Sequence, residues 1–184
     1  MLRKVRARRI AEGLLKEFKV KKVPVDIENI AKQLTTKDIR ELKGLSLRIQ
    51  REHFPSGLED VSAVLLKEKG HAIIAVNAAH SEYRQRFSIA HELGHLILHS
   101  NNELLTVDRY EKQFFTRAEG ISNLDEMEAN EFAAAFLMPS DLIREDFEKY
   151  FKKDPDEIIS KLAKRYEVSE AALAFRLKNL GLLS

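Results

Sequence analysis

The amino-acid sequence predicts an α+β fold, in which helices flank a small antiparallel sheet and the chain ends in a helical region with the outline of a helix-turn-helix. Two observations support this prediction. Apolar residues recur at helical spacing towards both ends of the chain, whereas residues 38–77 form short β-rich runs separated by turn residues. Of the 184 residues, 44% are hydrophobic and 33% are charged, as is typical of a chain that folds around a core.

Two helices are predicted in the first 34 residues. Residues 2–18 show helical spacing of their apolar side chains. Asp26 is placed to cap a second, shorter helix that ends at Leu34.

Four short segments then have the composition of β-strands. They are residues 38–43, 45–50, 61–67 and 71–77. A short turn that contains Gly70 joins the last two, so we expect them to form a β-hairpin. The other strand segments complete the small antiparallel sheet.

The rest of the chain returns to helical patterns. We expect helices at residues 81–99, 122–138, 154–165 and 169–179, with an irregular segment at 101–121. Pro139 stops the second of these helices. We therefore expect a first domain at residues 1–139 and a C-terminal helical region at residues 140–184.

Charge and composition exclude several classes of protein. The chain has no cysteine, so it holds neither disulfides nor thiolate metal ligands. It has no signal-peptide pattern and no apolar run long enough to span a membrane, so we expect a cytoplasmic protein. The net charge is +2, yet residues 1–22 alone carry +7. This basic excess predicts a solvated helix face or, alternatively, contact with nucleic acid or an acidic partner.

A His-Glu-Leu-Gly-His motif occupies residues 91–95, in the middle of the predicted helix 81–99. Histidines four residues apart lie about 40° apart around a helix and one turn along it, so His91 and His95 can bind one metal ion. Glu92 can accept a proton from a water molecule that the ion activates. The pattern predicts a catalytic zinc site, because zinc accepts imidazole ligands and such sites leave one position open for water.

A catalytic zinc site of this kind needs a third protein ligand. His99 continues the four-residue spacing but lies roughly 12 Å beyond His91. We interpret His99 as a structural or substrate-cleft residue, and no histidine follows it. The helix at residues 122–138 offers three glutamates: Glu126, Glu128 and Glu131. Helical phase disfavours Glu131, which points away from the apolar face of that helix, and does not choose between the other two.

Several blocks of sequence resemble the ImmA/IrrE family of metallopeptidases. They are residues 24–27, 76–77, 84–95, 128–139 and 168–181. The resemblance implies that Zn²⁺ is the cofactor and that Glu128 is the third ligand. It also implies a zinc endopeptidase that cleaves a helix-turn-helix transcriptional repressor, and so relieves repression of stress-response or mobile-element genes.

The alternative is a non-catalytic, zinc-stabilised transcriptional regulator or antitoxin-like binding module, which would not need Glu92. Direct binding of DNA by the C-terminal helices is not expected. A DNA-reading helix needs basic residues for phosphate contacts, whereas the last helix begins with Glu170 and the region as a whole is electrically balanced.

Two surfaces are candidates for docking a protein substrate. One is the basic first helix, which could steer an acidic partner. The other is the segment 101–121, where Phe114 and Phe115 could hold the substrate as an extended strand.

His99 and Tyr110 are candidates for stabilising the oxyanion.

Overall fold

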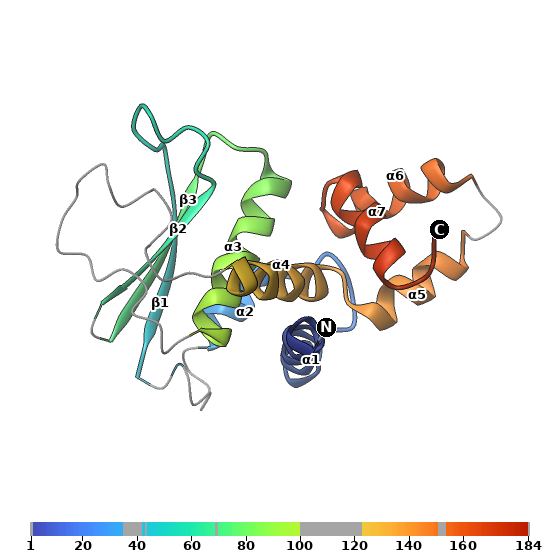
Figure 1. Ribbon diagram of the computed structural model, residues 1–184, viewed down its shortest axis with the longest axis horizontal. Helices are drawn as coiled ribbons and strands as arrows, with labels where there is room; N and C mark the ends of the chain where they lie inside the picture. Colours follow the sequence, from blue (N-terminus) through green and yellow to red (C-terminus); the bar gives the residue numbers. More distant parts are fainter. Residues whose placement is uncertain are drawn as a thin grey trace.

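The computed structural model describes residues 2–34, 42, 44–68, 70–99, 123–150 and 154–183. Within these ranges the chain forms seven helices and one three-stranded sheet, which confirms the α+β class (Figure 1). The elements are α1 (Leu2–Glu17), α2 (Ile27–Leu34), β1 (Ser46–Glu52), β2 (Ala63–Glu68), β3 (His71–Asn77), α3 (Glu82–Leu98), α4 (Asn123–Leu137), α5 (Ser140–Glu148), α6 (Pro155–Tyr166) and α7 (Glu170–Asn179). No helix among these described elements is long and apolar enough to span a membrane.

The sheet has the strand order β1–β3–β2. β2 and β3 form the predicted antiparallel hairpin, with Leu65 opposite Ile74. The prediction of a wholly antiparallel sheet is wrong, because β1 pairs with β3 in parallel and Leu47 lies opposite Ala72. β2 runs on the far side of the sheet from β1, and β3 then turns back into the space between them. The strand predicted at residues 38–43 lies outside the described residues, apart from Leu42.

The central helix pair is α3 and α4. Figure 1 shows α3 between the sheet and α4, and α4 packs in turn against α1. Ser81 caps α3, since its hydroxyl accepts a hydrogen bond from the backbone N–H of Arg84. The predicted buried face of α3 is confirmed, because Ile89, Ala90 and Leu93 have no exposed surface.

A glycine allows α3 and α4 to approach closely. A Cβ atom at Gly94 would lie 3.1 Å from Cδ1 of Phe132 and 3.2 Å from Cα of Ala129. Both distances are tighter than ordinary van der Waals contact, so a larger residue would push the helices apart. Gly94 stands directly before His95, and the close approach therefore brings α4 next to the histidines.

Both sides of α4 are covered. Its predicted apolar face is buried, including Phe132 and Phe136 with no exposed surface. Glu131, which points away from that face, is also buried, because it meets α1 rather than solvent. The Nε and Nη2 atoms of Arg8 both donate to Oε1 of Glu131, at 3.0 and 2.7 Å.

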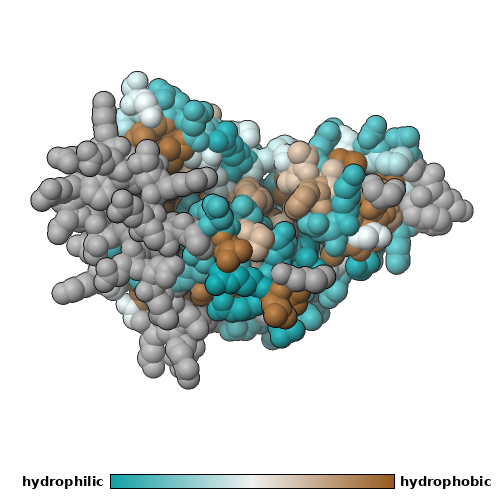
Figure 2. Space-filling model, viewed as in Figure 1, coloured by the Kyte–Doolittle hydropathy of each residue, from teal (hydrophilic) through white to brown (hydrophobic). Residues whose placement is uncertain are grey.

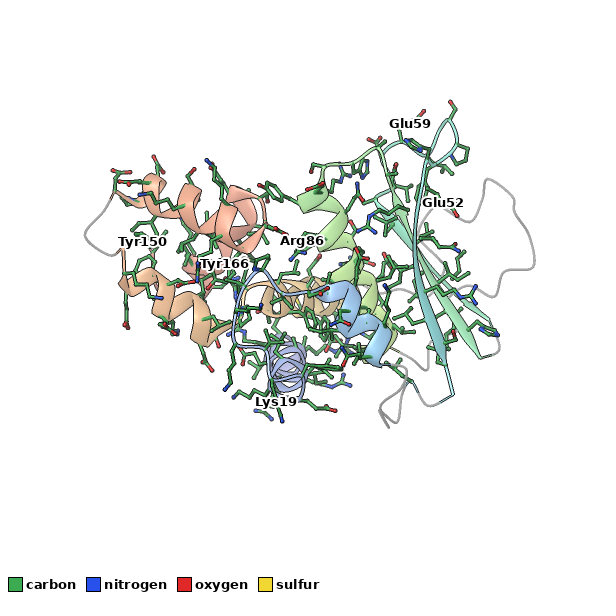
Figure 3. All side chains as sticks on the ribbon, turned by 180° about the vertical axis from the view of Figure 1, so that it is seen from behind. Lys19, Glu52, Glu59, Arg86, Tyr150 and Tyr166 are labelled. Atoms are coloured by element: carbon green, nitrogen blue, oxygen red, sulfur yellow. The ribbon has the colours of Figure 1, made fainter. Side chains whose placement is uncertain are left out.

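The C-terminal helices pack against the rest of the chain through two arginines. Arg176 of α7 is buried and donates from Nε to the backbone oxygen of Met138 at 3.1 Å. Arg86 of α3 donates to the backbone oxygen of Val25 and lies 3.4 Å from Glu167, at the turn between α6 and α7. Figure 3 shows Arg86 between α3 and these helices. The comparison of this region with a helix-turn-helix stays a prediction.

Candidate metal centre

Two histidines and one glutamate converge between α3 and α4. The Nε2 atoms of His91 and His95 lie 3.0 Å apart. The carboxylate of Glu126 reaches both rings, with Oε2 3.4 Å from Nε2 of His91 and Oε1 3.2 Å from Nε2 of His95. Three potential ligand atoms, one from each residue, therefore lie within 4.8 Å of one another.

This donor set fits a zinc ion. Nitrogen and carboxylate ligands bind zinc at 2.0–2.2 Å in tetrahedral geometry, so neighbouring ligand atoms are about 3.3 Å apart. The 3.0 Å between the two Nε2 atoms and the 3.2 Å from Glu126 to His95 are close to that spacing. Two imidazole nitrogens and one carboxylate also leave a fourth position open, as in a catalytic site.

Asn130 holds the first histidine in place. Its Oδ1 atom accepts a hydrogen bond from Nδ1 of His91 at 3.0 Å, which leaves Nε2 of His91 directed at the shared point. Asn130 lies four residues after Glu126, so both side chains come from the same face of α4. Sequence analysis did not find this role, because an asparagine on a helix gives no metal-site signal by itself.

A second cluster lies behind the first. Nδ1 of His95 is 3.2 Å from Nδ1 of His99, and Nε2 of His99 is 3.1 Å from Oε2 of Glu128. Asp125 completes the cluster at 3.6 Å from Nε2 of His99. His99 and Glu128 are both buried.

Arginines of α1 balance the charge of this second cluster. Nη1 of Arg3 lies 3.2 Å from Asp125 and 3.5 Å from Glu128. Nη1 of Arg6 lies 3.8 Å from Glu128. The buried carboxylate of Glu128 therefore faces two guanidinium groups as well as His99, as in an ion-pair network.

The electrostatics of the first cluster favour a cation. Burial disfavours a charge on His91, but the carboxylates of Glu126 and Glu92 outweigh it and raise the pKa of the imidazole. Hydrogen bonds from His91 and His95 hold the pKa of Glu126 far below its usual range. Burial raises the pKa of Glu92, while the neighbouring histidines act in the opposite direction.

The structure brings some of the predicted site residues together and separates others. His91 and His95 lie together, as the motif predicts, and Glu92 is partly buried beside them. Glu128 lies with His99 instead, and Glu126 is the carboxylate that meets the two histidines. His99 directs its nitrogens at His95 and Glu128, which leaves neither of them for an oxyanion. The other oxyanion candidate and the proposed docking segment, at residues 101–121, lie outside the described residues.

The paired helices and the convergence of two histidines and a glutamate are typical of metallopeptidases of the His-Glu-x-x-His class. Residues 43–178 match the peptidase M78 family model, described as the IrrE N-terminal-like domain. The chain belongs to this family.

Two curated relatives share this part of the chain. The radiation response metalloprotease IrrE of Deinococcus radiodurans is 37% identical over 109 residues, which cover 58% of this chain and 31% of the relative. Its counterpart in Deinococcus deserti is 30% identical over 109 residues, covering 58% of this chain and 36% of the relative. The match thus spans about a third of the length of each relative.

Proposed function

We propose that the chain is a zinc-dependent, site-specific endopeptidase whose metal ligands are His91, His95 and Glu126. The observation that carries this proposal is the convergence of two Nε2 atoms and one carboxylate on a single point. Membership of a metallopeptidase family supports the same reaction class.

Glu126 is the third ligand in this proposal, in place of the Glu128 that the family resemblance implies. Glu126 approaches both histidines within 3.4 Å. Glu128 faces His99 and the arginines of α1. Using Glu128 as a ligand would require its buried carboxylate to leave His99 and the arginines of α1, which is costly for a charged group.

A zinc ion bound here supplies a Lewis acid that activates water and polarises the peptide carbonyl. Glu92 serves as the general base that accepts a proton from the attacking water, and then passes it to the leaving amine. Partial burial raises the pKa of Glu92, which makes its carboxylate a stronger base than a fully solvated one.

His99 and Glu128 then act as a support for His95. If Nε2 of His95 faces the metal, its proton resides on Nδ1 and is donated to Nδ1 of His99. The proton of His99 consequently resides on Nε2 and is donated to the carboxylate of Glu128. This chain of hydrogen bonds fixes the tautomer and the ring orientation of His95.

The proposed substrate is a helix-turn-helix transcriptional repressor, whose cleavage would switch on stress-response or mobile-element genes. The two relatives are called radiation response metalloproteases, which supports a role in a stress response. We propose a peptidase domain at residues 1–139 and a C-terminal helical region at residues 140–184 that does not contact DNA directly.

The test is a Glu92→Gln variant, assayed on a helix-turn-helix repressor that the wild type cleaves. The amide keeps the shape of the side chain but cannot accept a proton, so we expect cleavage to fall by about 10²–10⁴-fold while zinc content is unchanged. Glu82→Gln, on the exposed first turn of α3, is the matched control and should cleave normally. Cleavage by Glu92→Gln at the wild-type rate would contradict the role of Glu92 as general base, whereas absence of cleavage by the zinc-loaded wild type would favour the non-catalytic binding module.

A further inference from the structure

A pocket opens beside the proposed metal centre. It has a volume of about 480 Å³ and is lined by residues from α1, α3, α4 and α7, together with Met138. Its walls include Glu126 and Asn130, which are the proposed third ligand and the residue that holds His91. The pocket therefore adjoins the proposed metal centre at these two residues.

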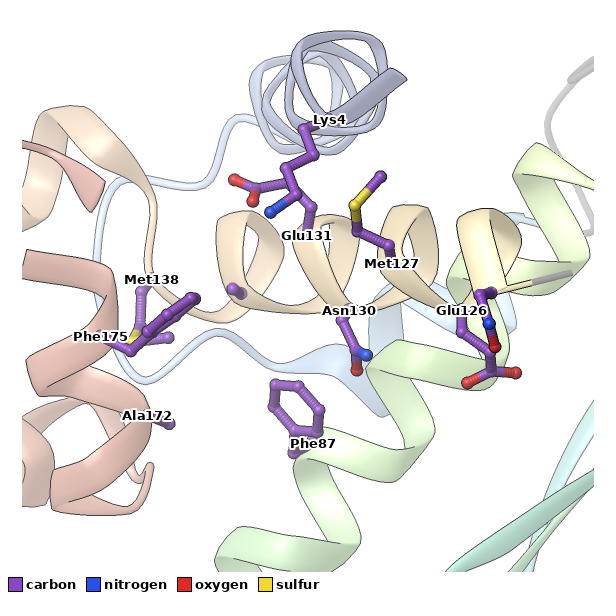
Figure 4. A pocket seen from close by; sticks show the side chains of 11 residues that line it. Lys4, Phe87, Glu126, Met127, Asn130, Glu131, Met138, Ala172 and Phe175 are labelled. Carbon is purple, nitrogen blue, oxygen red and sulfur yellow. The ribbon is translucent and has the colours of Figure 1, made fainter. Parts of the chain in front are cut away.

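Helical spacing explains why the pocket lies beside the proposed metal centre. Phe87 lies four residues before His91, so it occupies the same face of α3 one turn away from the ligands. Ala134 lies four residues after Asn130 and occupies the same face of α4. Figure 4 shows Phe87 opposite Asn130, with Glu126 further along α4. The faces that carry the ligands thus continue into the pocket.

The far wall comes from the C-terminal helices. Ala172 and Phe175 of α7 line the pocket, and the side chain of Phe175 is 61% exposed. Figure 4 shows Phe175 reaching towards this space from the side opposite Glu126. In the space-filling view, the surface is hollowed between the part that contains α3 and the part that contains α6 and α7 (Figure 2).

The lining is mainly apolar near α7 and mixed near α1. Phe87, Met127 and Phe175 supply aromatic and thioether surface. Glu131, the buried carboxylate in the lining, already accepts two hydrogen bonds from Arg8. Aromatic and methionine side chains favour an apolar occupant and adapt to its shape.

We propose that this pocket receives a large apolar side chain of the substrate, from a residue next to the peptide bond that is cut. The proposal rests on the metal centre proposed above and adds a specificity determinant to it. An apolar occupant would cover the exposed ring of Phe175, and its position would place the neighbouring carbonyl at the metal ligands.

Hydroxamates test this proposal without requiring the natural substrate. Acetohydroxamate chelates zinc through its two oxygens, and phenylacetohydroxamate adds one phenyl ring to the same group. Isothermal titration calorimetry on the zinc-loaded protein should show that phenylacetohydroxamate binds about 10- to 100-fold more tightly, as expected when one apolar ring is buried.

Three variants locate the effect. We call the ratio of the two affinities, phenylacetohydroxamate over acetohydroxamate, the phenyl advantage. Ala172→Leu narrows the pocket and should reduce this advantage to less than about 3-fold, while the affinity for acetohydroxamate stays unchanged. Phe175→Ala removes an exposed wall, so it should fold normally and also reduce the advantage. Leu124→Ala is the matched control, because Leu124 is 50% exposed and is absent from the pocket lining.

The outcomes separate the two proposals. Failure of acetohydroxamate to bind the zinc-loaded wild-type protein would overturn the metal centre, and the pocket assignment with it. Normal binding of acetohydroxamate, with no phenyl advantage or with the full advantage kept in both Ala172→Leu and Phe175→Ala, would overturn the pocket assignment alone.

Discussion

Glu126 and Glu128 show how two neighbouring acids on one helix take different roles. Residues two positions apart are separated by about 200° around a helix, so these two side chains leave α4 in different directions. Glu126 meets His91 and His95, whereas Glu128 meets His99. We infer that one helix supplies both a metal ligand and the support for a ligand on α3.

The proposed role of His99 in orienting His95 gives a prediction. His99→Phe keeps an aromatic ring of similar size but removes the acceptor for His95 and the donor to Glu128. We expect the dissociation constant for zinc to rise about 10- to 100-fold, as is usual when a hydrogen-bond partner of a ligand is lost.

Competition with a chelator measures this change. His71→Phe, at the exposed first residue of β3, is the matched control and should bind zinc like the wild type. A His99→Phe protein with wild-type zinc affinity would contradict the support role. A loss of stability in the metal-free protein, without a change in zinc affinity, would assign His99 to packing alone.

The pairing of His91 with His95 could be predicted from the sequence, but the carboxylate that lies beside them could not. His91 and His95 lie on one helix, so local spacing is enough to bring them together. The choice between Glu126 and Glu128 depends on which side of α4 faces α3 and which faces α1. That is a long-range property, and both glutamates are compatible with the apolar pattern of α4.

At the scale of the elements, the site depends on how closely α3 and α4 approach at Gly94. Gly94→Ala should lower the free energy of unfolding by about 1–3 kcal/mol, because its methyl group would crowd Phe132 and the backbone of Ala129. Gly13→Ala is the control, since Gly13 lies in α1 with no atom near the added Cβ. That change should stabilise the protein by up to about 1 kcal/mol.

Denaturant unfolding monitored by circular dichroism measures both changes. Opposite signs for the two glycine substitutions would support close packing at Gly94. Equal stabilisation by both would contradict it. Reduced zinc affinity in Gly94→Ala would further show that the distance between the helices governs the metal centre.

Most helix boundaries could be predicted because their signals are local. Asp26, Asp154 and Ser169 each accept a backbone hydrogen bond at the start of a predicted helix. The pairing of β1 with β3 could not be predicted, because strand order depends on long-range contacts. The short helix α5 was missed, and its N-cap, Pro139, makes no side-chain capping bond.

Across the whole molecule, the basic first helix has a structural role. Arg3, Arg6 and Arg8 face acidic side chains of α4, so part of the basic excess is matched within the chain. The sequence alone predicts a solvated face or an external partner for these charges. The pairing with α4 could not be predicted, because the two helices are more than 100 residues apart in sequence.

A buried carboxylate joins the C-terminal helices. Asp146 of α5 accepts hydrogen bonds from Lys149, from Nε of Arg165 and from the hydroxyl of Tyr166. Burial opposes the charge on Asp146, but these partners outweigh it and hold the pKa of the carboxyl below its usual range. The ionised form is therefore the one that stabilises the fold.

This network predicts a pH dependence of stability. A lowered pKa contributes stability above the unfolded value of about 3.9, and that contribution is lost as the pH falls through the lower folded-state pKa. Asp146→Asn should reduce the free energy of unfolding at neutral pH by about 1–3 kcal/mol. Unfolding curves between neutral pH and about pH 3 should show the difference from wild type shrinking. A constant difference would contradict the role of the charge.

The most direct test of the metal centre is the zinc content of the purified protein, measured by mass spectrometry of the metal for the wild type, Glu126→Gln and Glu128→Gln. The two variants make the same chemical change two residues apart on α4. We predict about one zinc per chain in the wild type and in Glu128→Gln, and well below one in Glu126→Gln, because Glu126, unlike Glu128, approaches both histidines. Full zinc content in Glu126→Gln, combined with its loss in Glu128→Gln, would contradict the account.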